Sequence, residues 1–396
     1  MRTAAVALLA LVTVFSAPVQ AGRGRVVYLR CEELAKCKLN GAFAPISGRV
    51  DLMEFDVSSG KRSVLAKGLF NGELRDFRES SIVVSHDGRY VAIGQGATIE
   101  GRDGDLPDGP YVWLKPNGLH LWNRKTRQIK DIYPEFNFHG LLWSSSSRYL
   151  AILGPYSEHP VRIYDALSGR MRDHSGYAEF TCAAWSAKRE ELIVVVPGSK
   201  GGSTVYALSV AGKRRVLFKW GDSIDAIAEF ADGSGYALCD SKGVVFYKPN
   251  GKTKRLPIYR SGRDLWGVEF QPQPVGSRMA VMSSYAFGEP HINDEKVLYA
   301  FRSGGGGFER MARWGTSYLS VQPSGGSITL MSLAGWVRGT SKVVLRGKVV
   351  WGGEAVTDNR TDRFVFWTFD VPRGRAGTKV FDTGPGCLSA GWWSGK

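Results

Sequence analysis

The residues that could do chemistry are few, and the densest group is a run of acids. Asp103, Asp105 and Asp108 lie close together in one polar segment. Calcium takes six to eight oxygen ligands, and alternating acids on a loop can supply some of them. Pro107 interrupts this run, and its spacing differs from that of an EF-hand loop. We therefore favour a solvated turn and expect neither a metal nor a cofactor, with Asp103, Asp105 and Asp108 as weak candidates for a cation.

Imidazoles are the second source of chemistry. His159 and His291 fall in two polar segments, the latter beside Glu289 and Asp294. Together they could form an acid–base or ligand-binding site, although six histidines scattered along the chain also allow chance proximity. The sequence has no Gly-x-Ser-x-Gly elbow, phosphate-binding loop, dinucleotide fingerprint or His-Glu-x-x-His motif. Catalysis is therefore the alternative hypothesis.

Aromatic side chains accompany the same segments. Tyr111 and Trp113 follow the acidic run, and Tyr285 and Phe287 precede His291. Aromatic anchors ringed by polar groups are the usual energetic centre of a protein interface. We predict that partner binding resides in these two segments, the alternative being that Trp113 and Tyr285 pack beneath their own loops.

Composition limits the class of protein. The chain has 396 residues, of which 43% are hydrophobic and 22% charged, and it contains 49 glycines. It is too apolar for disorder and too long for a disulfide scaffold, so a globular, turn-rich protein is expected. The formal net charge of +15 favours an anionic partner, either a protein or a polymer. Nucleic acid is not expected, because the Lys and Arg clusters lack the interleaved aromatics that stack on bases.

The N-terminus resembles a secretory signal. Arg2 precedes an apolar run over residues 4–15, and Val19-Gln-Ala21 offers the small residues of a cleavage site. We expect residues 1–21 to be removed and the protein to be periplasmic or secreted. The apolar run is shorter than the roughly 20 residues that a membrane span needs, and no later segment is long enough.

The number of cysteines is odd. There are five cysteines, so at least one is unpaired or pairs between chains. Cys31 and Cys37 are close enough in sequence to close one small loop, with a short helix between them as a candidate element. Cys182 and Cys239 lie in apolar strands, where small buried side chains are expected.

A strand–turn–strand unit recurs and must position these groups. It is clearest at Ile82-Val-Val-Ser-His-Asp-Gly-Arg-Tyr-Val-Ala and at Leu141-Leu-Trp-Ser-Ser-Ser-Ser-Arg-Tyr-Leu-Ala. Seven copies align at Val84, Trp143, Trp185, Phe230, Phe270, Val321 and Val356, with steps of 59, 42, 45, 40, 51 and 35 residues. Propeller blades repeat at roughly 40 to 50 residues. We predict one all-β propeller of four-stranded blades, seven in number, with six or eight as alternatives.

The ends of the chain should close the ring. An N-terminal hairpin at 49–67 has no inner strand pair of its own, and the last copy has a weak outer half. We expect this hairpin to complete the last blade, because closure leaves no exposed edge. The propeller then spans residues 22–386, residues 387–396 form a tail, and a monomer is expected.

The repeats resemble a known family. Ser85-His-Asp-Gly-Arg-Tyr-Val-Ala, Trp143-Ser-Ser-Ser-Ser-Arg-Tyr-Leu-Ala and Tyr164-Asp-Ala-Leu-Ser-Gly-Arg look like the WD40-like repeats of exported bacterial TolB-type propellers. The resemblance covers residues 80–260 best and lacks the Trp-Asp and Gly-His signatures of true WD40 repeats. It implies a propeller and, as the family's usual role, a protein-binding platform.

Loop lengths and charges divide the disc into two faces. The variable segments 96–118, 154–160, 197–203, 283–296 and 333–342 are assigned to loops between second and third strands, on one face. Acids concentrate there, whereas Lys and Arg cluster on the outer hairpins. We predict a non-enzymatic platform that binds a protein or polymer through the long-loop face. The alternative is a lyase or hydrolase acting on a glycan or peptide at the central mouth.

Overall fold

The computed structural model describes most of the chain. The described residues are 24–31, 45–75, 81–95, 98–103, 111–115, 118–133, 140–154, 161–174, 180–199, 201–256, 258, 264–286, 295–307, 309–315, 320–321, 326–350, 363–371, 377–384 and 386–394. Within these ranges the regular structure consists of strands, and none of it is helical. The proposed signal sequence and Cys37 lie outside them.

The strands form seven blades, and the strands of each blade follow one another from the axis outward. Blade 1 is β4 (Ser81–Val84), β5 (Tyr90–Gln95), β8 (Gly118–Asn123) and β9 (Gln128–Tyr133). Blade 2 is β10 (Gly140–Trp143), β11 (Tyr149–Leu153), β12 (Val161–Asp165) and β13 (Arg170–His174). Blade 3 is β14 (Cys182–Trp185), β15 (Glu191–Pro197), β16 (Ser203–Ser209) and β17 (Arg214–Trp220). Blade 4 is β18 (Ile224–Glu229), β19 (Tyr236–Asp240), β20 (Gly243–Tyr247) and β21 (Thr253–Arg255).

The remaining blades contain the longest strands. Blade 5 is β22 (Asp264–Pro272), β23 (Arg278–Ala286), β24 (Glu295–Arg302) and β25 (Glu309–Gly315). Blade 6 is β27 (Gly326–Trp336), β28 (Lys342–Val350), β29 (Arg363–Asp370) and β30 (Thr378–Asp382), with the short β26 (Ser320–Val321) paired to the start of β27. Blade 7 is β31 (Cys387–Trp393), β1 (Arg25–Cys31), β2 (Pro45–Asp56) and β3 (Lys61–Arg75).

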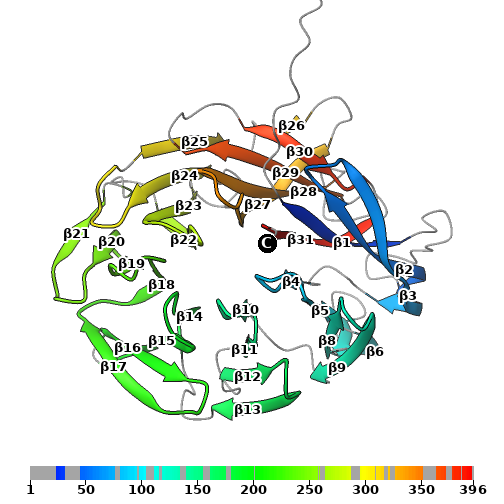
Figure 1. The fold of residues 1–396 in the computed structure, drawn as a ribbon, viewed down its shortest axis with the longest axis horizontal. Coiled ribbons are helices and arrows are strands. Elements are labelled where there is room, and N and C mark those ends of the chain that lie inside the picture. Colours follow the sequence, from blue (N-terminus) through cyan, green and yellow to red (C-terminus); the bar gives the residue numbers. More distant parts are fainter. Residues whose placement is uncertain are drawn as a thin grey trace, which may run out of the picture.

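The blades are arranged around a common axis. Their innermost strands contact one another in the order β4, β10, β14, β18, β22, β27 and β31, and β31 contacts β4 again. Figure 1 shows this closed ring, with the C-terminal strand beside the axis. The prediction of an all-β propeller with seven four-stranded antiparallel blades is confirmed.

The blade turns explain the recurring sequence motif. In blade 1 the Asp87 carboxylate accepts hydrogen bonds from the Ser85 hydroxyl (2.7 Å) and the Arg89 backbone N–H (2.9 Å). The Ser85 hydroxyl oxygen accepts another from the Tyr90 backbone N–H at 3.0 Å. Gly88 has a φ of +69°, a conformation that a residue with a Cβ rarely adopts. Ser85, Asp87 and Gly88 therefore close the turn through their own side chains or conformation, whereas Arg89 and Tyr90 contribute backbone N–H groups.

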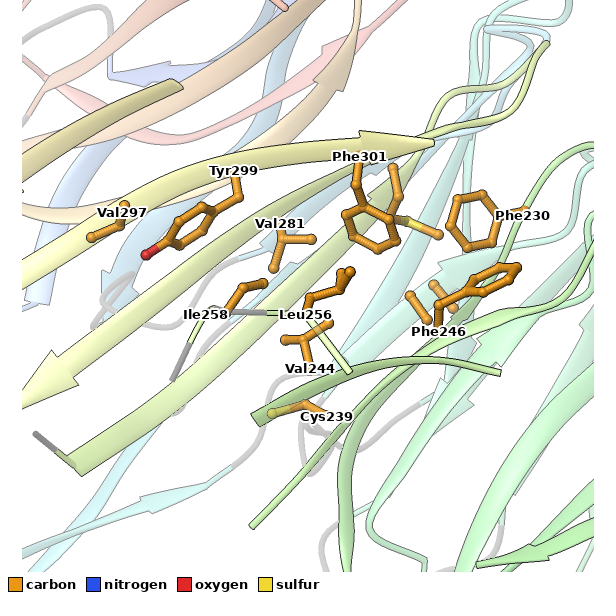
Figure 2. Packing of buried hydrophobic residues seen from close by; sticks show 13 residues of the cluster. Phe230, Cys239, Val244, Phe246, Leu256, Ile258, Val281, Val297, Tyr299 and Phe301 are labelled. Carbon is orange, nitrogen blue, oxygen red and sulfur yellow. The ribbon is translucent and has the colours of Figure 1, made fainter. Parts of the chain in front are cut away.

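The core is divided into seven clusters, one between each pair of neighbouring blades. Side chains alternate across a strand, so Leu192 and Val194 pack toward blade 2 while Ile193 and Val195 pack toward blade 4. Figure 2 shows the cluster between blades 4 and 5, where the Phe230 ring meets those of Phe246 and Phe301 at centroid distances of 5.3 and 5.5 Å. A blade with two apolar faces is stable only between neighbours, which is why the ring must close.

Indole hydrogen bonds also join consecutive blades. The Nε1 of Trp143 donates to the Val83 carbonyl at 3.1 Å, and that of Trp185 donates to the Leu142 carbonyl at 2.7 Å. The Trp336 indole donates to the Gln271 carbonyl at 2.9 Å. Each bond runs from an innermost strand to the innermost strand of the preceding blade. The recurring tryptophan thus links neighbouring blades through an indole hydrogen bond.

Strands from the two chain ends meet in blade 7. Over most of their length β31 and β1 pair antiparallel, from Arg25↔Trp393 to Leu29↔Ser389. The Trp393 indole donates to the His86 carbonyl in blade 1 at 3.0 Å. The guanidinium carbons of Arg25 and Arg124 each lie 5.1 Å from the centroid of the Trp393 ring.

A buried carboxylate completes this contact, which we call the terminal clasp: Arg25, Glu54, Gly88, Arg124 and Trp393. Glu54 pairs with Arg25 at 3.0 Å and also with Arg124. The Arg124 Nε donates to the Gly88 carbonyl at 3.0 Å. The terminal clasp therefore links β31, β1, β2 and blade 1.

The sequence alignment of the copies is wrong at the C-terminal end. Val321 lies in β26, and the innermost strand of blade 6 is the later β27. Val356 lies outside the described residues, and the seventh innermost strand is β31, so residues 387–393 are a strand and not part of a tail. Segment 333–342 is expected from the sequence to be a loop between second and third strands. It is instead the end of β27 and the turn to β28, which are the first and second strands of blade 6. Hairpin 49–67 lies within β2 and β3, the outer half of blade 7.

Candidate functional site

Chain direction defines two faces of the disc. Turns between first and second strands, and between third and fourth strands, lie on the same face, which we call the turn face. Connections between second and third strands and between blades lie on the opposite face, the loop face. The described turns are 57–60, 85–89, 124–127, 144–148, 166–169, 186–190, 210–213, 230–235, 248–252, 273–277, 303–307 and 337–341.

Most residues that line the central channel are apolar or aromatic, but polar atoms make up nearly half of its exposed surface. It has a volume of about 450 Å³ and is lined by residues of all seven innermost strands. Five indoles gather at its turn-face end, namely Trp143, Trp185, Trp336, Trp392 and Trp393. Most of each ring is covered by neighbouring blades, so the indoles contribute mainly to the wall.

Few titratable side chains face the channel region, and those present already have partners. The Glu229 carboxylate accepts hydrogen bonds from the Ser186 hydroxyl (2.6 Å) and the Ala187 backbone N–H (2.7 Å). The Arg346 guanidinium donates to the Ala390 carbonyl at 2.8 Å. Burial lowers the pKa of Arg346, while the nearby Glu269 carboxylate acts in the opposite direction.

Glu269 and His86 complete this set. The Glu269 carboxylate accepts a hydrogen bond from the Leu333 backbone N–H at 2.8 Å. The side chain keeps contact with solvent, but partial desolvation by the surrounding protein raises its pKa. His86 lies at the channel mouth, where burial lowers the pKa of its imidazole. Within the described part of the chain no three His, Cys, Asp or Glu residues gather as they would to hold a metal ion.

The turn face has a strong excess of positive charge. Its described turns carry eleven cationic side chains: Arg89, Arg124, Lys125, Arg127, Arg148, Lys188, Arg189, Lys213, Lys248, Lys252 and Arg338. They carry three acids: Asp87, Glu190 and Asp232. This cationic excess agrees with the expected charge on the side of the disc opposite the acidic loops.

Only some of these cations are neutralised locally. Arg148 binds both oxygens of Asp165, at 3.2 and 2.8 Å, and Arg124 belongs to the terminal clasp. Seven cations form no ion pair with a described carboxylate: Lys125, Arg127, Lys188, Arg189, Lys213, Lys248 and Lys252. Their charge is available to a partner.

Most residues singled out from the sequence lie on the loop face or outside the described ranges. His159, Phe287, His291, Asp105 and Asp108 are outside those ranges. The structure therefore neither brings the two imidazoles together nor separates them.

The first-blade loop contains a hairpin of its own. Here β6 (Thr98–Asp103) pairs with β7 (Tyr111–Lys115), and Asp103 is opposite Tyr111 in the register. Trp113 lies in β7 and Tyr285 near the end of β23. The segment expected to be a simple loop is thus partly a two-stranded sheet at the rim (Figure 1).

Some turn-face residues are not predicted as functional, because the sequence-based prediction assigns binding to the long loops. Lys188 and Arg189 appear in the sequence only as part of a short turn between two strands. Their signal is an excess of Lys and Arg in short turns, and the outer hairpins show the same signal at residues 124–127 and at Lys213.

The chain resembles solved propellers in fold. It matches a protein proposed to be a 6-phosphogluconolactonase from Bacteroides fragilis, with a TM-score of 0.50 and 10% identity over 95% of this chain and 99% of that chain. A similar protein from Bacteroides uniformis gives 0.51 and 11%, over 94% and 99%. TolB from Acinetobacter baumannii gives 0.40 and 13%, over 71% and 62%. No family model and no curated protein matches the sequence.

These likenesses concern the fold alone, since the identities are 10 to 13%. The seven-bladed ring is the fold that the TolB-type and WD40-like repeats implied, so the expectation of a propeller is confirmed. No helix among the described residues has the length and apolar character needed to cross a membrane.

Proposed function

We propose that this propeller is a non-enzymatic platform, exported from the cytoplasm, that binds an anionic partner through its turn face. The observation that carries the proposal is the set of seven turn-face cations without a described carboxylate partner. A rigid ring presents these charges at fixed spacing, and clustered charge of one sign steers and retains a partner of the opposite sign. The signal-like segment 1–21 supports export.

The channel supports a binding role more than a catalytic one. General acid–base catalysis needs a titratable group that is free to reach the proton it moves, and many hydrolases and lyases use a pair of such groups. Glu229, Glu269 and Arg346 each contact backbone groups or a hydroxyl, and none is hydrogen-bonded to another of the three. Their contacts hold the wall of the channel.

Retention on immobilised poly-L-glutamate tests this function. The variant Lys213→Glu with Lys252→Glu replaces two turn-face cations by anions and should lower the affinity about tenfold at low salt, with the loss shrinking as salt is added. A matched control, Lys67→Glu with Lys219→Glu, makes the same charge change on exposed positions of β3 and β17 away from the turns. It should retain most of the affinity.

Equal weakening by the two double variants would mean that only net charge matters and would contradict a turn-face site. No retention of the parent protein on poly-L-glutamate in dilute salt would contradict the platform as a whole. Circular dichroism of both variants checks that the fold is kept, which is expected because exposed charges contribute little to stability.

A second candidate surface is the hairpin β6–β7 on the loop-face connection of blade 1. An ordered two-stranded insertion on a rigid blade is a common form of binding element. Tyr111, Trp113, Tyr285 and Phe287, with His159 and His291, remain our proposed contacts for a protein partner there. Replacing Tyr111 and Phe287 together by Ala should abolish capture of a partner that binds this surface, while the melting temperature stays near that of the parent.

A further inference from the structure

A pocket opens at the turn-face end of the seam between blades 3 and 4. Its volume is about 340 Å³, within the range of small-ligand sites. It is lined by the first turns of both blades and the outer turn of blade 4, together with β15, β16, β17, β18, β19 and β20. None of the residues singled out from the sequence as binding or metal candidates belongs to it.

The deep part of the pocket is aromatic. The rings of Phe218 and Tyr247 stack with centroids 4.0 Å apart, and Tyr236 lies 5.6 Å from Phe218. Ile193 and Ala207 also line this part. This apolar recess has Phe218 and Tyr236, each more than nine-tenths buried, as its floor. Its exposed apolar surface comes from the half-buried Leu217 and Tyr247, against which an inserted side chain would pack.

The rim of the pocket is cationic. Lys188 and Arg189 come from the first turn of blade 3, are exposed, and form no ion pair with a described carboxylate. The third cation, Arg215, pairs with Glu191 at 2.8 Å. The other carboxylate in the lining, Glu229, accepts two hydrogen bonds from the turn of blade 3. These hydrogen bonds come from neutral groups and leave the charge of Glu229 in place, so the lining has three cations against two carboxylates, a net charge of +1. Lys188 and Arg189 are its cations without a carboxylate partner among the described residues.

Tyr236 adds a neutral polar group. Burial, with a smaller contribution from Glu229, raises the pKa of Tyr236 to about 12. Its hydroxyl therefore stays protonated at physiological pH and adds no negative charge to the recess. A carboxylate that entered the pocket would meet this neutral hydroxyl and two cations, with Glu229 as the one lining carboxylate not paired with a cation.

An aromatic recess beside two rim cations favours a ligand that carries a bulky apolar group next to a carboxylate. A flat sugar ring would need an exposed aromatic face to stack on, and here the Phe218 and Tyr247 rings already cover each other. A charged polymer without apolar side chains would use the rim and leave the recess empty. A peptide with Phe or Leu flanked by Asp or Glu satisfies both parts.

We infer that the pocket between blades 3 and 4 recognises a short acidic segment of a partner protein, with one bulky apolar side chain in the aromatic recess and flanking carboxylates on Lys188 and Arg189. The inference rests on the proposed turn-face function and specifies the partner as protein. One or two residues fill a volume of this size, so the remaining affinity comes from the surrounding cations.

Two peptides test the inference on the full mature chain. Ac-Glu-Glu-Phe-Glu-Glu-NH2 and Ac-Glu-Glu-Ala-Glu-Glu-NH2 have the same charge and differ only in the central side chain. We expect the Phe peptide to bind at least about tenfold more tightly, because the Phe side chain buries more apolar surface in the recess than the Ala side chain does. Dissociation constants from calorimetry or from heteronuclear NMR titration measure the ratio.

Two variants locate the binding. The exposed pair Lys188→Ala with Arg189→Ala should weaken both peptides about tenfold, whereas Lys67→Ala with Lys219→Ala should change neither. Tyr247→Ala enlarges the recess and should bring the Phe-to-Ala ratio close to one. Since that variant also removes a stacked ring, its melting curve is measured alongside.

The outcomes separate the two proposals. If poly-L-glutamate is retained on the turn face but the two peptides bind equally, the pocket inference is overturned and the platform stands. If heparin binds more tightly than either peptide and competes with both, the partner is a polysaccharide and the inference is also overturned. If neither polymer nor peptide binds, both proposals fail.

Discussion

At the scale of single residues, an ion pair between a buried carboxylate and an exposed guanidinium shows how blade 4 holds a charge. Asp240 is 2% exposed and receives the Arg255 guanidinium at both oxygens, at 2.7 and 2.8 Å. The Trp220 indole and the Lys242 backbone N–H also donate to it. Burial pushes the pKa of Asp240 up, but the hydrogen bonds outweigh it and hold the pKa below its usual range.

This pair predicts a defined acid response. A carboxyl whose pKa is lower in the folded state stabilises that state above its unfolded pKa of about 3.9, and the contribution is lost as pH falls through the folded pKa. Asp240→Asn should cost about 2 kcal/mol at pH 7 and flatten the decline of stability below pH 5. Urea unfolding at pH 7, 5 and 3.5 measures both effects. A variant whose loss at pH 3.5 equals that at pH 7 would contradict this role.

Glycine at the terminal clasp gives a second residue-scale prediction. A Cβ on Gly88 would lie 2.2 Å from the Trp393 ring, and Gly88 has a φ of +69°. Gly60 has a φ of +68° with no atom within 4 Å of the same position. Gly60→Ala therefore carries the backbone strain alone, about 1 kcal/mol, and Gly88→Ala carries in addition the displacement of Trp393.

The comparison of the two alanine variants measures the clash. We expect Gly88→Ala to lower the free energy of unfolding by about 3 kcal/mol, because overpacking a well-filled site adds about 1–3 kcal/mol to the strain. Chemical denaturation of both proteins gives the difference. Equal destabilisation of the two variants would show that the Trp393 ring does not pack against Gly88, and would contradict the terminal clasp.

At the scale of elements, the sequence predicts the early blades well and the late ones poorly. In blades 1 and 2 the Ser-rich turn between inner strands has side chains that hydrogen-bond to the backbone, and such local chemistry is visible in sequence. Blade 6 turns at Val337-Arg-Gly-Thr-Ser without that signature, so the pattern alone predicts a long loop there. β31 ends the chain and has no following turn to mark it.

The alignment predicts the register correctly in the first three blades, where Val84 is the last residue of β4. Trp143 and Trp185 occupy the last position of their innermost strands, as aligned. Phe230 instead opens the turn after β18, and Phe270 lies two residues before the end of β22. An aromatic residue packs equally well at either place, so pattern alone does not distinguish them.

The pocket between blades 3 and 4 could not be predicted in this way. Its cations come from residues 188 and 189, its rings from residues 218, 236 and 247. These segments belong to two blades and meet only through the ring geometry. Sequence shows the charge of a turn but not the aromatic recess beside it.

At the scale of the whole molecule, closure through β31 should decide cooperativity. A chain ending after Gly386 lacks the innermost strand of blade 7 and leaves β1 and β4 without their neighbour. We expect a broad, non-cooperative melting curve and aggregation, because an exposed strand edge and an open apolar seam result. Deleting residues 49–67 should have a similar effect. Differential scanning calorimetry measures both.

A chain ending after Ser394 is the matched control, since it keeps β31 intact and loses two residues beyond it. It should unfold like the parent. If the chain ending after Gly386 also melted like the parent, the ring would not depend on its C-terminal strand.

The central claim is that an anionic partner binds on the cationic turn face. Hydrogen–deuterium exchange of the mature protein, with and without poly-L-glutamate at low salt, tests it most directly. We predict slower exchange in and beside turns 124–127, 186–190, 210–213 and 248–252, with little change at β6 and β7. Slower exchange confined to segments 96–118 and 283–296 of the loop face, with the four turns unchanged, would contradict the account.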